Sequence, residues 1–90
     1  MNNIIIPEQL RKLMGGQKVL MFELKDITEL IERLSSDYPN VKERLINKNG
    51  EFNRFVNVYV NGEDIRFLEN ITTKLKDGDE ISIVPAIASG

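Results

Sequence analysis

The dipeptide Asn61-Gly62 is the feature of this sequence that most constrains the fold. Both central residues of a two-residue type I′ turn need positive φ, which Asn and Gly adopt readily. The flanking residues, 55–60 and 63–67, alternate in a way typical of strands that bury one face. We therefore expect a β-hairpin over residues 55–67. Its expected pairs are Val60 with Glu63, Val58 with Ile65 and Val56 with Phe67.

The clearest helix signal begins at Asp26. Its carboxylate can accept hydrogen bonds from the first helical turn, and Glu29 three residues later completes a capping box. We expect the helix to end near Tyr38, because Pro39 cannot continue it. Apolar residues recur at helical spacing and predict that one face of the helix lies on a sheet. They are Ile27, Leu30, Ile31 and Leu34.

The remaining patterns complete a sheet around this helix. Residues 4–6 and 19–24 are interpreted as strands joined by a single helical turn, and residues 80–84 as the last strand. Residues 41–49 have spacing that also suits a short helix, but we treat them as a connection. The order predicts an α+β ubiquitin-like β-grasp, with a mixed sheet of four to five strands and one main helix on one face.

Composition excludes most catalysis by side chains. The chain has no cysteine and no histidine, so it lacks thiolate nucleophiles and the usual metal ligands. Glu63 and Asp64 are adjacent in a predicted strand and would point to opposite faces, so we expect no metal site.

Charge and hydropathy narrow the kinds of partner. A net charge of -2, with 14 acidic and 12 basic residues in no long block, argues against nucleic acid and membrane partners. We expect a cytoplasmic location, because no apolar run could span a membrane and residues 1–3 do not resemble the start of a secretory signal. Proteins are the expected partners.

The last five residues form a tail beyond the final predicted strand. They are Ala86, Ile87, Ala88, Ser89 and Gly90. We divide the chain into a domain of residues 1–85 and a flexible tail of residues 86–90. Residues 85–90 extend to at most about 20 Å, at about 3.3–3.6 Å per residue. Such a tail can be threaded into the channel of an enzyme, with the Gly90 carboxylate as the reactive group and no side chain needed.

Six groups of residues carry a resemblance to a known family over most of the chain. They are Gly15-Gly16-Gln17-Lys18, Arg54-Phe55-Val56-Asn57, Tyr59-Val60-Asn61, Glu63-Asp64-Ile65-Arg66-Phe67, Asp77-Gly78-Asp79, and Pro85-Ala86 leading to Gly90. In order and spacing, these residues resemble the ThiS/MoaD group of ubiquitin-like sulfur carriers. The chain looks most like the CysO branch of that group, which serves cysteine biosynthesis.

The resemblance implies that the chain is a protein co-substrate and not an enzyme. A partner of the ubiquitin-activating type would adenylate the Gly90 carboxylate with ATP, and a sulfur donor would displace AMP to leave a thiocarboxylate. In the CysO-like branch, the sulfur attacks an aminoacrylate on a pyridoxal-phosphate cysteine synthase, and a metalloprotease then releases cysteine. The chain itself would bind no cofactor tightly. The alternatives are a thiamine sulfur carrier and the small subunit of molybdopterin synthase, which works with a large catalytic subunit.

The chain departs from the family pattern at Ser89, because family members usually end in two glycines. Serine adds a Cβ that restricts the backbone and a hydroxyl that needs a partner when enclosed. A tight activating site would reject Ser89, whereas a looser site would accept it. If the tail is not charged, the chain is a non-covalent ubiquitin-like binding module.

The outward face of the predicted hairpin is a candidate docking surface. An extended tail offers little contact area, so we expect a partner to contact Phe55, Tyr59, Arg66 and Leu68 as well. Two structural alternatives stay open. Phe55 and Tyr59 could instead pack beneath the loop of residues 47–53, and Arg66 could be only a cross-strand partner of Asn57.

Overall fold

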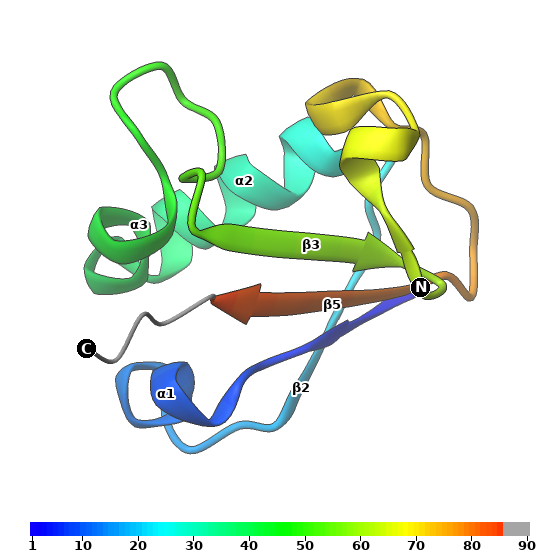
Figure 1. Ribbon diagram of the computed structural model, residues 1–90. Helices are drawn as coiled ribbons and strands as arrows, with labels where there is room; N and C mark the ends of the chain where they lie inside the picture. The colour runs from blue at the N-terminus through cyan, green and yellow to red at the C-terminus, as the bar shows by residue number, and fades with distance from the viewer. Residues whose placement is uncertain (86–90) are drawn as a thin grey trace.

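The computed structural model describes residues 1–85. Its five strands form one mixed sheet in the order β2-β1-β5-β3-β4 (Figure 1). The strands are β1 (Asn2–Ile5), β2 (Val19–Phe22), β3 (Val56–Val60), β4 (Glu63–Asp64) and β5 (Glu80–Pro85). β1 and β5 are parallel, and every other neighbouring pair is antiparallel. This arrangement confirms the predicted α+β β-grasp architecture with its mixed sheet.

Helix α2 (Ile27–Asp37) is the main helix, and its predicted apolar stripe is buried in the core. The Asp26 carboxylate accepts a hydrogen bond from the Glu29 N–H at 2.9 Å, as the capping box predicts. Glu29 reaches back one residue further than expected, because its Oε1 accepts from the Lys25 N–H at 2.8 Å. The helix ends at Asp37, with Tyr38 as its C-cap, which confirms the expected end.

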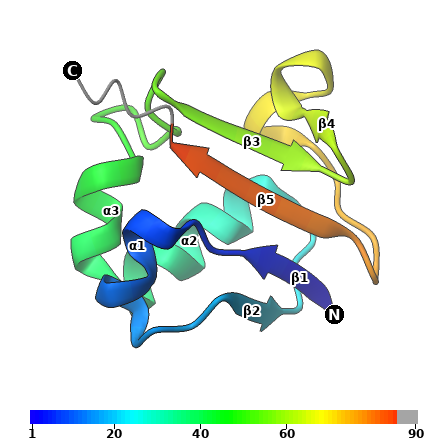
Figure 2. The same cartoon turned by 60° about the horizontal axis from the view of Figure 1, so that its bottom comes forward.

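Two short helical segments join β1 to β2, namely α1 (Glu8–Arg11) and the 3₁₀ helix η1 (Lys12–Met14). They confirm the single helical turn expected in this connection. Gly15 follows with φ of 72°, a left-handed conformation that glycine adopts without strain. In both views, α1 and α3 lie at the end of the sheet where β5 ends (Figures 1 and 2).

The prediction of a plain connection over residues 41–49 is wrong for its first half. Helix α3 (Pro39–Leu45) begins directly after α2 and buries Val41 and Leu45. Proline at a first helical position costs no hydrogen bond, since that N–H has no helical partner. Pro39 therefore ends one helix and starts the next.

The predicted hairpin is confirmed at its turn but not along its whole length. Asn61 and Gly62 have φ of 52° and 88°, and Val60 pairs with Glu63. The chain then leaves the sheet after Asp64 and forms the 3₁₀ helix η2 (Ile65–Phe67), followed by η3 (Asn70–Thr72). The predicted pairs of Val58 with Ile65 and Val56 with Phe67 are therefore absent from the strand register.

The Asp64 side chain explains this departure. Its Oδ1 accepts a hydrogen bond from the Arg66 N–H at 2.8 Å, which is a local turn that competes with strand pairing. Ile65 then enters the core, whereas Phe67 is left 82% exposed.

In the part of the chain that the structure describes, no helix has the length and apolar character needed to cross a membrane.

Candidate functional site

Strand β5 carries the chain to the point where the predicted tail begins. β5 pairs with β1 on one side and with β3 on the other, and Pro85 lies opposite Val56. Ile81 and Ile83 anchor the strand in the core. The predicted tail residues Ala86, Ile87, Ala88, Ser89 and Gly90 lie outside the described residues. Their proposed role and the domain boundary at residue 85 therefore stay predictions.

The face of the sheet opposite α2 carries exposed apolar side chains, and we call it the outer sheet face. Strand register places Tyr59, Ser82, Ile5 and Val19 in one row across it. Val19, Met21 and Val84 on this face are 45%, 60% and 45% exposed. Sequence reasoning did not single out these three residues. Alternation in β2 could have found Val19 and Met21, since the intervening Leu20 is buried.

The structure places the four predicted docking residues on different elements, although Arg66 bonds Asp64, the strand partner of Tyr59. Tyr59 lies on the outer sheet face, and Phe55 directly precedes β3. Phe55 is 64% exposed, so it does not pack beneath the loop of residues 47–53, and Phe52 packs against the core instead. Arg66 belongs to η2 and Leu68 follows it, so the full hairpin strand expected to present them is absent.

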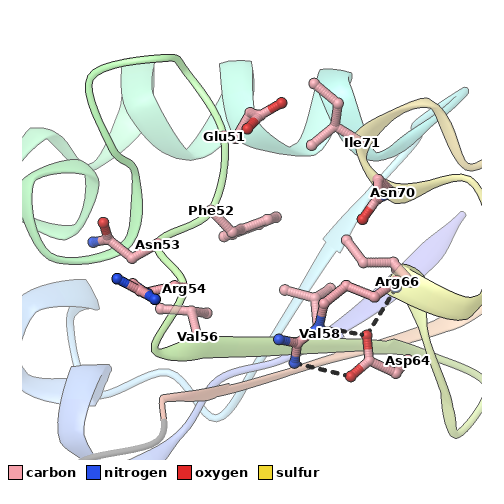
Figure 3. Close-up of a pocket in the computed structure, with 11 residues that line it drawn as sticks. Glu51, Phe52, Asn53, Arg54, Val56, Val58, Asp64, Arg66, Asn70 and Ile71 are labelled. Carbon is pink, nitrogen blue, oxygen red and sulfur yellow. Dashed lines mark hydrogen bonds and ion pairs between the residues drawn. The ribbon is translucent and has the colours of Figure 1, made fainter.

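Arg66, Asp64 and Asn57 of β3 form a small polar cluster, and Figure 3 shows the contacts between Arg66 and Asp64. The Arg66 Nη2 lies 3.0 Å from Asp64 Oδ2 and also donates to Asn57 Oδ1. Arg66 therefore contacts Asn57, but from η2 and not as the cross-strand partner that the alternative described. Hydrogen bonds from Arg66 hold the pKa of Asp64 below its usual value, and the same carboxylate raises the pKa of Arg66. The cluster fixes the start of η2.

We expect the Arg66→Gln variant to raise the pKa of Asp64, because the guanidinium that stabilises the carboxylate is lost. NMR titration of the Asp64 side chain checks this. In the wild type, the stabilisation from this pair is complete above the unfolded pKa of about 3.9 and is lost as pH falls through the lower folded pKa. Arg33→Gln is the control and leaves the titration of Asp64 unchanged. An ordinary Asp64 pKa in the wild type would contradict the assignment.

A cavity of about 290 Å³ opens at the edge of β3, and we call it the β3-edge cavity (Figure 3). Its apolar lining comes from Phe52, Val56, Val58, Ile65 and Ile71. Its polar lining comes from Glu51, Asn53, Arg54, Asp64, Arg66 and Asn70. The cavity occupies the space along β3 that the predicted second strand of the hairpin would have covered.

Among residues 1–85, no group of three or more acidic side chains is arranged to hold a metal ion. The whole chain has neither cysteine nor histidine to supply a strong nucleophile or a near-neutral base.

Comparison with known proteins gives a match over nearly the whole chain. The ThiS family profile matches residues 4–90. This chain belongs to the ThiS family. The sulfur carrier protein CysO of Mycobacterium tuberculosis is 39% identical to this ThiS-family chain over 89 residues, covering 97% of the chain and 96% of CysO. Small archaeal modifier protein 3 of Haloferax volcanii is 33% identical over 78 residues, covering 83% and 84%.

Solved structures resemble the ThiS-family chain over the same length. A chain in the crystal structure of the Amycolatopsis orientalis BexX/CysO complex superposes with a TM-score of 0.89 at 37% identity, covering 100% of both chains. Crystalline CysO of Mycobacterium tuberculosis gives a TM-score of 0.85 at 37% identity, covering 97% of this chain and 100% of CysO. The resemblance seen in the sequence and the predicted fold are thereby confirmed.

Proposed function

We propose that this chain is a sulfur carrier protein, in which the C-terminal carboxylate of Gly90 is converted to a thiocarboxylate. One observation carries the proposal: the match to the sulfur carrier CysO covers 97% of this chain and 96% of the relative. The family profile also extends through residue 90, so it includes the tail. A cytoplasmic location, as expected from the sequence, accompanies this role.

The proposed chemistry needs only the end of the main chain. A Gly90 carboxylate oxygen attacks the α-phosphorus of ATP on a partner enzyme, and pyrophosphate leaves. Hydrosulfide then attacks the acyl carbon of the adenylate, and AMP leaves with the bonded oxygen. The product is a thiocarboxylate, and the hydrosulfide proton is released to solvent. An anionic sulfur is a far better nucleophile than its protonated form, so the carrier can then donate sulfur to an electrophile.

The fold supports this role by holding the start of the tail firmly. β5 is paired with β1 as far as Ser82 and with β3 as far as Pro85, which lacks the N–H needed to continue a ladder. A partner can therefore dock on a rigid body while it works on the chain end. We propose that Phe55, Tyr59, Arg66 and Leu68 contribute to this docking, together with exposed apolar residues of the outer sheet face.

The proposed partners are enzymes that charge and discharge the tail. The first is an adenylating enzyme of the ubiquitin-activating type, which uses the ATP. If the chain works as CysO-like carriers do, two further partners are a pyridoxal-phosphate cysteine synthase, which accepts the sulfur, and a metalloprotease, which releases cysteine. Selective retention of a cysteine synthase supports this branch, whereas a stable complex with the large subunit of molybdopterin synthase would favour that alternative. A thiamine pathway would require a different acceptor.

Intact-mass analysis tests the carrier function directly. After incubation with ATP, sulfide and an adenylating enzyme from the same genome, the full chain is expected to gain the mass that replaces one oxygen with sulfur. Fragmentation should place the change at Gly90. The Ser89→Gly variant is the matched control, because it restores the usual glycine pair. An unmodified wild type beside a fully charged Ser89→Gly variant would favour the non-covalent binding module.

A further inference from the structure

The size and lining of the β3-edge cavity limit what it can hold. Its volume of about 290 Å³ lies at the lower limit of small-molecule sites, which span about 300–1,000 Å³. Phe52 and Ile71 wall it opposite the buried side chains of Val56 and Val58 (Figure 3). An apolar group of the size of one large side chain fits such a space better than a nucleotide does.

The position of the cavity connects it with the tail. Val56 lines the cavity and is also the residue that lies opposite Pro85 at the end of β5. The Cα atoms of directly opposed residues in antiparallel strands are about 4.5–5.5 Å apart. A protein with a side chain in the cavity would therefore contact the domain directly beside the start of the tail.

The rim of the cavity has the composition of a binding surface. Arg54 is exposed and makes no ion pair within residues 1–85, whereas the guanidinium of Arg66 is already held by Asp64. Phe55 and Phe67 are the sequence neighbours of these two arginines; they do not line the cavity, but they are 64% and 82% exposed. Aromatic and arginine side chains are enriched at protein interfaces and among the residues that dominate binding energy.

We infer that the β3-edge cavity is the anchor site for the enzyme that activates the tail. The enzyme inserts one large apolar side chain between Phe52, Val58 and Ile71, and an acidic residue beside that side chain pairs with Arg54. The identity of this partner rests on the proposed function. The cavity adjoins the outer sheet face, because the Arg66 guanidinium that lines it also donates to Asn57 Oδ1.

Two variants of the full chain test the anchor site. Arg54→Glu reverses the charge at the rim, and Ile71→Phe fills the cavity from its wall. Lys74→Glu is the matched control, because it is an exposed charge reversal that does not line the cavity. For each protein we would measure kcat and KM for thiocarboxylate formation by the adenylating enzyme, and the Kd of the uncharged carrier by calorimetry.

Both test variants are expected to raise KM and Kd about tenfold or more, with kcat close to the wild-type value, since anchor residues dominate binding energy. Lys74→Glu stays near wild type. A KM and Kd within twofold of wild type for Arg54→Glu would overturn the anchor site, even if Ile71→Phe failed to fold. Failure of the proposed function gives a different result. In that case the wild-type chain would bind the enzyme with a measurable Kd, but no thiocarboxylate would form.

Discussion

Conversion of the Gly90 carboxylate to a primary amide is expected to abolish thiocarboxylate formation. The amide lacks the anionic oxygen that must attack the α-phosphorus of ATP, and the chain has no cysteine that could accept sulfur in its place. The amidated protein can be made by ligating a synthetic C-terminal peptide to the folded domain. Intact-mass analysis after incubation with ATP, sulfide and the adenylating enzyme measures the loss.

The control for this experiment is the same ligated protein with a free carboxylate, which should be charged like the wild type. Binding to the enzyme through the folded domain should survive amidation, because Arg54 and the rest of the cavity rim are unchanged. Sulfur incorporation into the amidated protein would place the modification on another group and contradict the proposed site. A companion variant without Ser89 and Gly90 should keep domain binding and lose normal transfer.

Much of the fold could be predicted because strong local signals agreed with the packing. Asn61-Gly62 fixed the turn between β3 and β4 through its positive φ angles. The capping residue Asp26 and the apolar stripe beginning at Ile27 predicted α2 almost to its last residue. In both cases a backbone requirement and a burial pattern led to the same structure.

Where local signals competed, the prediction failed. Pro39 suits both the end of one helix and the first position of another, so sequence reasoning recognised the end of α2 but not the start of α3. Alternation predicted that the second strand would continue past Asp64, whereas the bond from its side chain to the Arg66 N–H favoured η2. Burial of Ile65 outweighed the exposure of Phe67.

The candidate site also has features that the sequence could suggest and features that depend on the folded structure. The role proposed for Gly90 comes from the family resemblance and stays a prediction, since it depends on the chemistry of a chain end outside the described residues and not on a spatial arrangement. The β3-edge cavity could not, because it exists only where the expected strand pairing stops. The row from Val19 to Tyr59 on the outer sheet face likewise depends on the register of four strands.

The Leu30→Ala variant is expected to have the largest effect on stability, lowering the free energy of unfolding by about 2–5 kcal/mol. Leu30 is 0% exposed in the first half of α2 and belongs to the core cluster, so truncating its side chain leaves a cavity in the core. Urea denaturation followed by far-UV circular dichroism measures the loss. In a domain of this size, each kcal/mol lowers Tm by about 4–8 °C.

Glu32→Ala is the matched control for Leu30→Ala, because it truncates an exposed residue of the same helix and should change stability by no more than about 0.5 kcal/mol.

Since small domains are stabilised by only about 5–15 kcal/mol, Leu30→Ala should unfold part of the population on mild warming. Charging should then decline with the folded fraction, because a partner that docks on the body needs β3 and β5 in register. Undiminished charging of the unfolded variant would mean that the tail alone suffices for recognition, and that neither the cavity nor the outer sheet face contributes to docking.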